Sequence, residues 1–467
     1  MTVHANASPR LTTTKRGRDL GPSAVLGLFG VFAAILMLVL NREPADSVAG
    51  PALACALSLV ILILSRRDED GDAIVLAWAV RLLVAFVAYR LFIMANTTQG
   101  DWVRYDELGW QTALDIRSGA ARPGLSFGSS ADNVIALVGQ LYASLGRSPS
   151  MVVAIESALG LLASLLCLAT CRLLVRRPPA AVRYGLLFFP SFVFWTTMVG
   201  KDPFVALGLA LGVYGAVAMC VGRGRALVNL VTMAAGVGLC LLYRPYLCLV
   251  QVPALLAGML FALFRRSAGG MSGGARVRRP ARIAIAATLI LGFAAIPTVV
   301  AAGMQKLRIS SLDVDEIVGA AGRQRSSLGW SGGSNTGFTG YASPGDVVRK
   351  LPESLVTLFF RPFPWEARNG AAAIAAVDTL LFEGLWIWLL ASFLRRRRRS
   401  ETRFSPSRPA VRFLLVWTAL WTVMFMNMTA NLGTMVRHRV QIVPVVLLLA
   451  AVVSSRSAER RESDGAA

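Results

Sequence analysis

Five short segments of this sequence place charged side chains beside aromatic residues and prolines, each at the edge of a long apolar run. The segments are GDWVRYDELGW (100–110), FFPSFVFWTTMVGKDPF (188–204), LLYRPYL (241–247), FFRPFPWEARNG (359–370) and NLGTMVRHRVQIVP (431–444). A carboxylate in such a place can take up a proton, and a guanidinium or ammonium group can bind an anion. The segments therefore predict acid–base and anion-binding chemistry.

The first segment supplies the candidate catalytic residues. It carries Asp101, Asp106 and Glu107 directly after an apolar run, at the expected boundary between lipid and water. A carboxylate at this boundary can take a proton from a hydroxyl group, and helical spacing puts Asp101 and Tyr105 on one face. The alternative is a solvated interfacial helix whose aromatic residues form a belt at the membrane surface.

The other four segments supply the candidate anion-binding residues. Lys201 and Asp202 precede Pro203 at a tight turn, where the free N–H groups of a helix start favour an anion. An arginine at membrane depth, such as Arg244, is costly unless paired and marks a functional site. Because a guanidinium binds phosphate through two parallel hydrogen bonds, we predict a lipid-phosphate site. Its residues are Lys201, Asp202, Arg244, Arg361, Glu366, Arg437, His438 and Arg439.

Two simpler interpretations of these cations stay open. Lys201 and Asp202 could neutralise each other and cap helices. The arginines near the last apolar run could pair with acids inside other runs, namely Glu156, Asp378 or Glu383.

The composition indicates a membrane protein. Of the 467 residues, 55% are hydrophobic and only 16% are charged, with a mean hydropathy of +0.58, whereas soluble proteins carry about 25% charged residues. The net charge of +22 would suit nucleic acid, but the arginines interrupt apolar runs instead of covering a hydrophilic surface, so we expect no nucleic-acid partner. All six cysteines lie in apolar segments, which predicts no disulfide framework.

Twelve apolar runs predict the membrane spans. A helix needs about 20 residues to cross the hydrocarbon core, so we predict an all-α, polytopic integral membrane protein with about 12 transmembrane helices. The runs are 22–40, 48–64, 73–95, 150–171, 181–199, 203–221, 226–243, 245–264, 283–302, 371–394, 411–428 and 437–454.

The basic residues predict the orientation of these spans. Positively charged loops stay in the cytoplasm, and with an inside N-terminus 29 of the 48 basic residues fall in inside segments, including the run Arg395–Arg399. We therefore predict cytoplasmic tails at 1–21 and 455–467, a transmembrane domain at 22–454, and long outer loops at 96–149 and 303–370. All five chemical segments then fall on the outer side and predict a basic pocket at the lipid boundary with carboxylates nearby.

Three tracts resemble a known group of proteins. FFPSFVFWTTMVGKDPFVALGLALGVYG, RPFPWEARNG and NLGTMVRHRVQIVP look like those of bacterial polytopic glycosyltransferases and polysaccharide polymerases, the broad GT-C-like and Wzy/EpsG-like group, over about 73–454. The resemblance implies a multi-pass protein of the bacterial plasma membrane. It would transfer sugar from a polyprenyl-(pyro)phosphate-linked donor to a saccharide or lipid acceptor on the outer face.

The resemblance also implies roles for individual residues. It makes Asp101 or the pair Asp106 and Glu107 the base, and it makes four arginines the phosphate clamp: Arg244, Arg361, Arg437 and Arg439. It leaves open a divalent metal, Mg²⁺ or Mn²⁺, held by the three acids. One departure is that GT-C proteins carry an acidic pair after the first span, where this chain has only Glu43 and Asp46.

Two other functions fit the same pocket. A flippase or transporter of a lipid-linked saccharide would use it without making a bond, and it would need polar or broken helices through the membrane interior. A non-catalytic membrane subunit of an envelope-assembly complex would use the arginines only to bind lipid headgroups.

Overall fold

The computed structural model is a bundle of helices. Every regular element in its described part is helical, which confirms the predicted all-α class. The structure describes residues 21–40, 48–94, 101–120, 122–127, 129–264, 279–311, 313–329, 341, 343–367, 370–398, 409–426 and 432–464.

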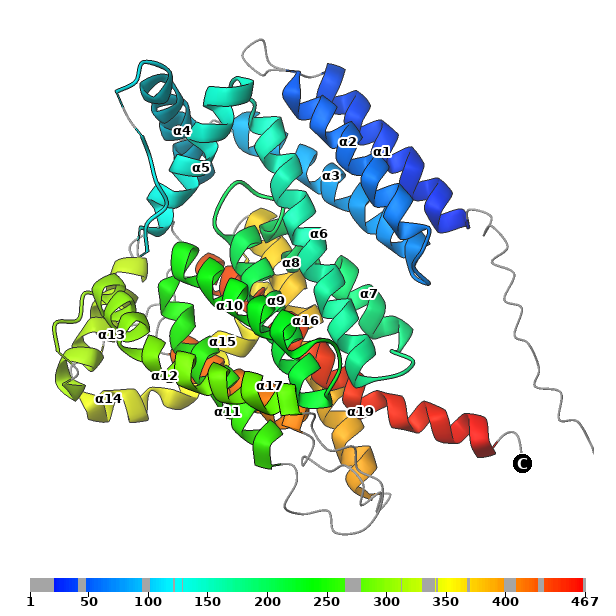
Figure 1. The fold of residues 1–467 in the computed structure, drawn as a ribbon, viewed down its shortest axis with the longest axis vertical. Coiled ribbons are helices and arrows are strands. Elements are labelled where there is room, and N and C mark those ends of the chain that lie inside the picture. Colours follow the sequence, from blue (N-terminus) through cyan, green and yellow to red (C-terminus); the bar gives the residue numbers. More distant parts are fainter. Residues whose placement is uncertain are drawn as a thin grey trace, which may run out of the picture.

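The three N-terminal helices form a group of their own. Helices α1 (Pro22–Leu40), α2 (Ala49–Ser65) and α3 (Gly71–Met94) lie side by side (Figure 1) and share a small hydrophobic core around Trp78. The long helix α6 (Pro149–Leu174) packs against α2 and α3 on one side and against the larger bundle on the other. It therefore joins the two parts of the molecule.

Helix α9 (Asp202–Val221) is the centre of the larger bundle. It is buried along most of its length and contacts α6, α10 (Ala226–Tyr243), α11 (Cys248–Phe264) and α17 (Pro409–Met426). The other elements of this part are α7 (Ala180–Phe188), α8 (Pro190–Trp195), η1 (Pro245–Leu247), α12 (Arg279–Leu307), α13 (Val314–Gly329), α14 (Pro344–Arg349), α15 (Leu351–Phe360), η2 (Pro364–Glu366), α16 (Gly370–Arg398), α18 (Leu432–Arg439) and α19 (Val443–Asp464).

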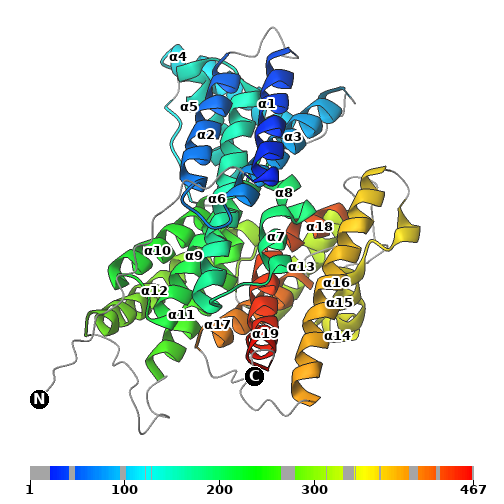
Figure 2. The same ribbon diagram turned by 90° about the vertical axis from the view of Figure 1, so that its right-hand side faces the viewer.

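Two further helices cover one end of the bundle. Helices α4 (Asp101–Arg117) and α5 (Ser130–Leu145) pack together there (Figure 2), and we call this the α4 end. The α4 end carries the starts of α6 and α9 and the end of α10, while α19 runs toward the opposite end. Residues far apart in sequence can therefore meet at the α4 end.

The helices indicate a membrane protein. Six helices in the described residues are long and apolar enough to cross a membrane, or seven if the bent pair Leu432–Arg439 and Val443–Ser454 is one span. Each of the twelve predicted runs coincides with a helix or with a helix pair, but several are shorter or broken, as at Pro190 between α7 and α8. The count of twelve spans stays a prediction.

Close packing of α9 on α10 depends on glycine. A Cβ atom added at Gly236 would lie 2.5 Å from the carbonyl oxygen of Gly208 and 2.7 Å from the backbone nitrogen of Gly212. Gly208 and Gly212 are four residues apart and so lie on one face of α9, the small-residue spacing that lets membrane helices approach closely. This contact sets α9 and α10 side by side and so places the start of one beside the end of the other.

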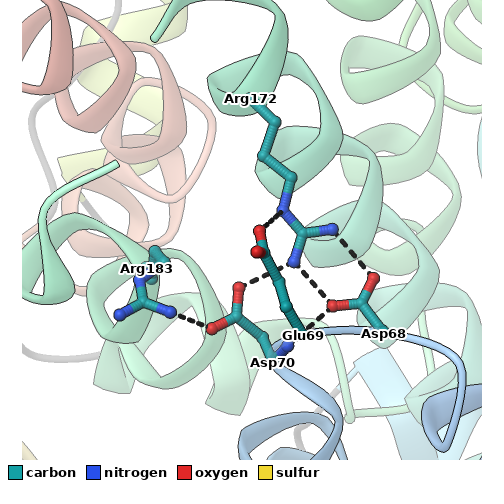
Figure 3. A network of polar contacts seen from close by, with 5 residues as sticks. All are labelled: Asp68, Glu69, Asp70, Arg172 and Arg183. Carbon is teal, nitrogen blue, oxygen red and sulfur yellow. Dashed lines mark hydrogen bonds and ion pairs between the residues drawn. The ribbon is translucent and has the colours of Figure 1, made fainter. Parts of the chain in front are cut away.

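A charged network ties the N-terminal group to α6 at the end opposite the α4 end (Figure 3). Arg172 of α6 binds both carboxylate oxygens of Asp68, at 2.6 and 2.8 Å, and one oxygen of Asp70 at 2.7 Å. Glu69 also pairs with Arg172, and Arg183 of α7 pairs with Asp70. The hydrogen bond from Arg172 holds the pKa of Asp68 below its usual value. The network fixes the turn between α2 and α3 against α6 and α7.

The glycine contact gives the first testable prediction. Gly236→Ala should lower the stability of the purified protein in detergent by about 1–3 kcal/mol, because overpacking forces the helices apart. Gly238→Ala is the matched control on the same helix, since an added Cβ there meets no atom within 4 Å. It should be neutral or stabilising through helix propensity. Equal thermal unfolding temperatures for the two variants would contradict the close approach of α9 and α10.

Candidate functional site

A buried carboxylate shared by two arginines forms the centre of the candidate site. Asp202 begins α9 and Arg244 directly follows α10, so the antiparallel pair of helices brings them together. Arg244 Nη2 donates to Asp202 Oδ1 at 2.6 Å, and Arg437 Nε of α18 donates to Asp202 Oδ2 at 2.5 Å. The side chains of Asp202 and Arg244 are each 6% exposed. In a buried ion pair with this geometry, each charge offsets the free-energy cost of burying the other.

Arg437 extends this arrangement to the first segment of the sequence. Its Nη1 lies 3.3 Å from Oδ2 of Asp101, the first residue of α4, and its guanidinium carbon lies 5.1 Å from the ring centroid of Trp195. The ion pairs therefore run from Arg244 through Asp202 and Arg437 to Asp101. We call Asp101, Lys201, Asp202, Arg244 and Arg437 the Asp202 cluster.

Lys201 is the third cation of this cluster. Its Nζ lies 6.0 Å from the ring centroid of Tyr105, one turn after Asp101 on α4. Burial, and then the nearby charges of Arg244 and Arg437, lower the pKa of Lys201 to about 8. Burial also raises the pKa of the Tyr105 hydroxyl, helped by the charge of Asp101. Lys201 can therefore change its charge near neutral pH.

Glu156 contributes a third carboxylate beside the cluster. It lies in the second turn of α6, is 2% exposed, and accepts a hydrogen bond from the Gly200 N–H at 3.0 and 3.1 Å from its two oxygens. A Cβ atom added at Gly200 would lie 3.8 Å from Arg437 Nη2, so the backbone that binds Glu156 adjoins the arginine. From the sequence, Glu156 is predicted only as a partner for the arginines. Its position as an acid inside an apolar run is the sequence signal that indicates a functional site.

The other two acids of the first segment lie outside the Asp202 cluster. Asp106 accepts a hydrogen bond from the Tyr142 hydroxyl at 2.6 Å and pairs with Arg147, so it holds α4 to α5. Glu107 is exposed on α4. No group of three or more His, Cys, Asp and Glu side chains in the described residues is placed to hold a metal ion, and the three predicted acids do not converge.

His438 lies beside the cluster in the core. His438 follows Arg437 directly in the chain, and its ring centroid is 4.5 Å from that of Phe425. His438 Nδ1 and Arg244 Nη1 are buried polar atoms without a hydrogen-bond partner in the described residues.

Arg439 points to the other side of α18 and is bound by protein groups. It is fully buried, and its Nε donates to the Leu358 carbonyl at 2.6 Å. It also donates to Thr379 Oγ1 at 2.8 Å and to the carbonyls of Thr357 and Arg361. Arg439 therefore caps the end of α15 and fastens it to α16.

Arg361 and Glu366 pair with each other in the turn between α15 and α16. Arg361 Nε lies 2.9 Å from Glu366 Oε1, and the Phe363 N–H donates to Glu366 at 2.9 Å. This pair meets the candidate site only indirectly, through Arg439 and α18. Four of the five segments contribute residues to the Asp202 cluster or lie beside it. The remaining segment, 359–370, stabilises a neighbouring turn.

Comparisons with protein-family models, curated proteins and solved structures find no match for this chain.

The role of Arg439 as a helix cap can be tested by substitution. Arg439→Lys should lower the stability in detergent by about 2–4 kcal/mol, because one ammonium group cannot replace donors that reach four separate acceptors. The control is Arg349→Lys on α14, whose side chain is exposed and which should leave the unfolding temperature unchanged. If Arg439→Lys unfolds at the wild-type temperature, Arg439 is not a structural cap.

Proposed function

We propose that this chain is a membrane glycosyltransferase. It transfers sugar from a polyprenyl-(pyro)phosphate-linked donor to a saccharide or lipid acceptor, in cell-envelope polysaccharide or glycolipid assembly. The observation that carries the proposal is the Asp202 cluster, in which Lys201, Arg244 and Arg437 gather at the α4 end beside the exposed carboxylate of Asp101.

The cations of the cluster suit the phosphate of the donor. Arg437 offers a guanidinium whose side chain is 20% exposed, and Lys201 lies beside it at the start of α9. Charge-assisted hydrogen bonds from such groups are the strong ones for phosphate. Arg244 Nη1 is a further buried donor without a hydrogen-bond partner in the described residues, and an anionic oxygen would satisfy it.

Asp101 is the base in this proposal. Its side chain is 56% exposed, so an acceptor hydroxyl can reach it, whereas Asp106 is bound by Tyr142 and Arg147. The acceptor oxygen forms a bond to the anomeric carbon while its proton passes to Asp101. The bond from that carbon to the phosphate oxygen breaks, and the electron pair leaves with the phosphate. Arg437 and Lys201 stabilise the charge that develops on the leaving group.

The location and topology belong to the same proposal. The α4 end faces the outside of a bacterial plasma membrane, the two tails are cytoplasmic, and about twelve helices cross. The clustering of basic residues on the opposite loops supports this orientation.

The proposal predicts a loss of transfer in Asp101→Asn. The purified protein in proteoliposomes should transfer sugar from a polyprenyl-linked donor, and the substitution should lower the rate by about 10²–10⁴-fold, since it removes the general base. Asp115→Asn is the matched control: it removes the same charge from α4, about 21 Å along the helix from Asp101. Unchanged transfer in folded Asp101→Asn protein would remove Asp101 from the mechanism.

The same assay distinguishes a glycosyltransferase from the second candidate function, a flippase. Arg81 of α3 is fully buried and bound by the hydroxyl groups of Thr196 and Ser164, at 2.7 and 2.9 Å. A buried cation bound by hydroxyl groups is a feature expected of a pathway through a membrane protein. Movement of the labelled lipid across the membrane without any product would favour the flippase.

The pKa of Lys201 predicts that phosphate binding depends on pH. Its pKa of about 8 means that the ammonium is charged below pH 8 and neutral above it. Affinity for farnesyl phosphate in detergent should therefore fall by about tenfold between pH 7 and 9, as one charge-assisted hydrogen bond is lost. Lys201→Arg stays charged over this range and should bind with constant affinity. A decline of equal size in both proteins would show that Lys201 is not the titrating group.

A further inference from the structure

Carboxylates already occupy the arginines around Asp202. Within the described residues, Asp202 pairs with both Arg244 and Arg437, and Asp101 pairs with Arg437. An anion that binds Arg437 beside both carboxylates lies close to two like charges, which repel it. A phosphate on Arg437 therefore competes with one of these two carboxylates.

The two carboxylates differ in how firmly they are held. Asp202 is 6% exposed and bound by two arginines at 2.5 and 2.6 Å. Asp101 is 56% exposed and lies 3.3 Å from Arg437, its one ion-pair partner in the described part of the chain. Exposed pairs contribute little stability, so Asp101 is the carboxylate that gives way.

We propose that Asp101 is a displaceable counter-ion of Arg437 and that the donor phosphate takes its place. The displaced carboxylate is then free to accept the proton of an acceptor hydroxyl. The base is paired while the site lacks donor and is released when donor binds, so donor binds before the acceptor is activated. This inference rests on the proposed function for the identity of the anion.

The test is a double-mutant cycle on binding. The probe is farnesyl phosphate, with affinity measured in detergent at pH 7 for wild type, Asp101→Asn, Arg437→Gln and the double variant. Removal of the competing carboxylate should tighten binding by about two- to fivefold. In the Arg437→Gln background the same substitution should give no gain, because the two anions no longer compete for one guanidinium. Asp115→Asn should bind like wild type.

Each outcome decides a separate point. If Asp101→Asn binds farnesyl phosphate with wild-type or lower affinity, phosphate does not displace Asp101 from Arg437. Sugar transfer by the wild type would still support the proposed function. An equal gain with and without Arg437 would mean simple charge repulsion and would also overturn the displacement. Absence of binding by every protein would instead refute the phosphate site itself. If Arg437→Gln does not fold, Arg437→Lys replaces it, because a lysine cannot bind two carboxylates as the guanidinium does.

Discussion

The carboxylate of Asp202 is the constraint on which the candidate site depends. It lies buried between Arg244 and Arg437, which come from the end of α10 and from α18. Removal of one partner from a buried ion pair leaves an uncompensated charge at a cost of about 3–5 kcal/mol, so each of the three residues requires the others. The pairing therefore fixes the relative positions of three helix ends, and Arg437 in turn holds Asp101 at the start of α4.

Packing in two places makes this pairing possible. The glycine contact between α9 and α10 brings the start of one helix beside the end of the other. On the far side of α18, Arg439 binds the last carbonyls of α15 and a hydroxyl of α16. Two residues along a helix correspond to a turn of about 200°, so Arg437 and Arg439 face opposite sides. One short helix thus connects the polar site to the hydrophobic bundle.

The sequence predicted the positions of the helices better than the interaction partners of the charged side chains. Apolar runs and prolines at helix starts located α6, α9 and α16 to within a few residues, because these signals are local. Four of the five charged segments contribute residues to the Asp202 cluster or lie beside it. Arg437 and Arg439 could not be told apart in the sequence, since the difference lies in which side of α18 meets α15. Asp101 and Asp106 were equivalent for the same reason, and only the packing of α5 on α4 shows that Asp106 is bound by Tyr142.

The net charge of +22 has little to do with the chemistry of the site. Most of the excess lies in the basic loops, whereas the arginines around Asp202 are paired with carboxylates. A low-dielectric region cannot hold several unpaired cations ready for a phosphate. It can hold them paired, with one weakly held carboxylate that an incoming anion replaces. Selectivity for the anion then depends on how tightly Asp101 is bound, because the phosphate must compete with it for Arg437.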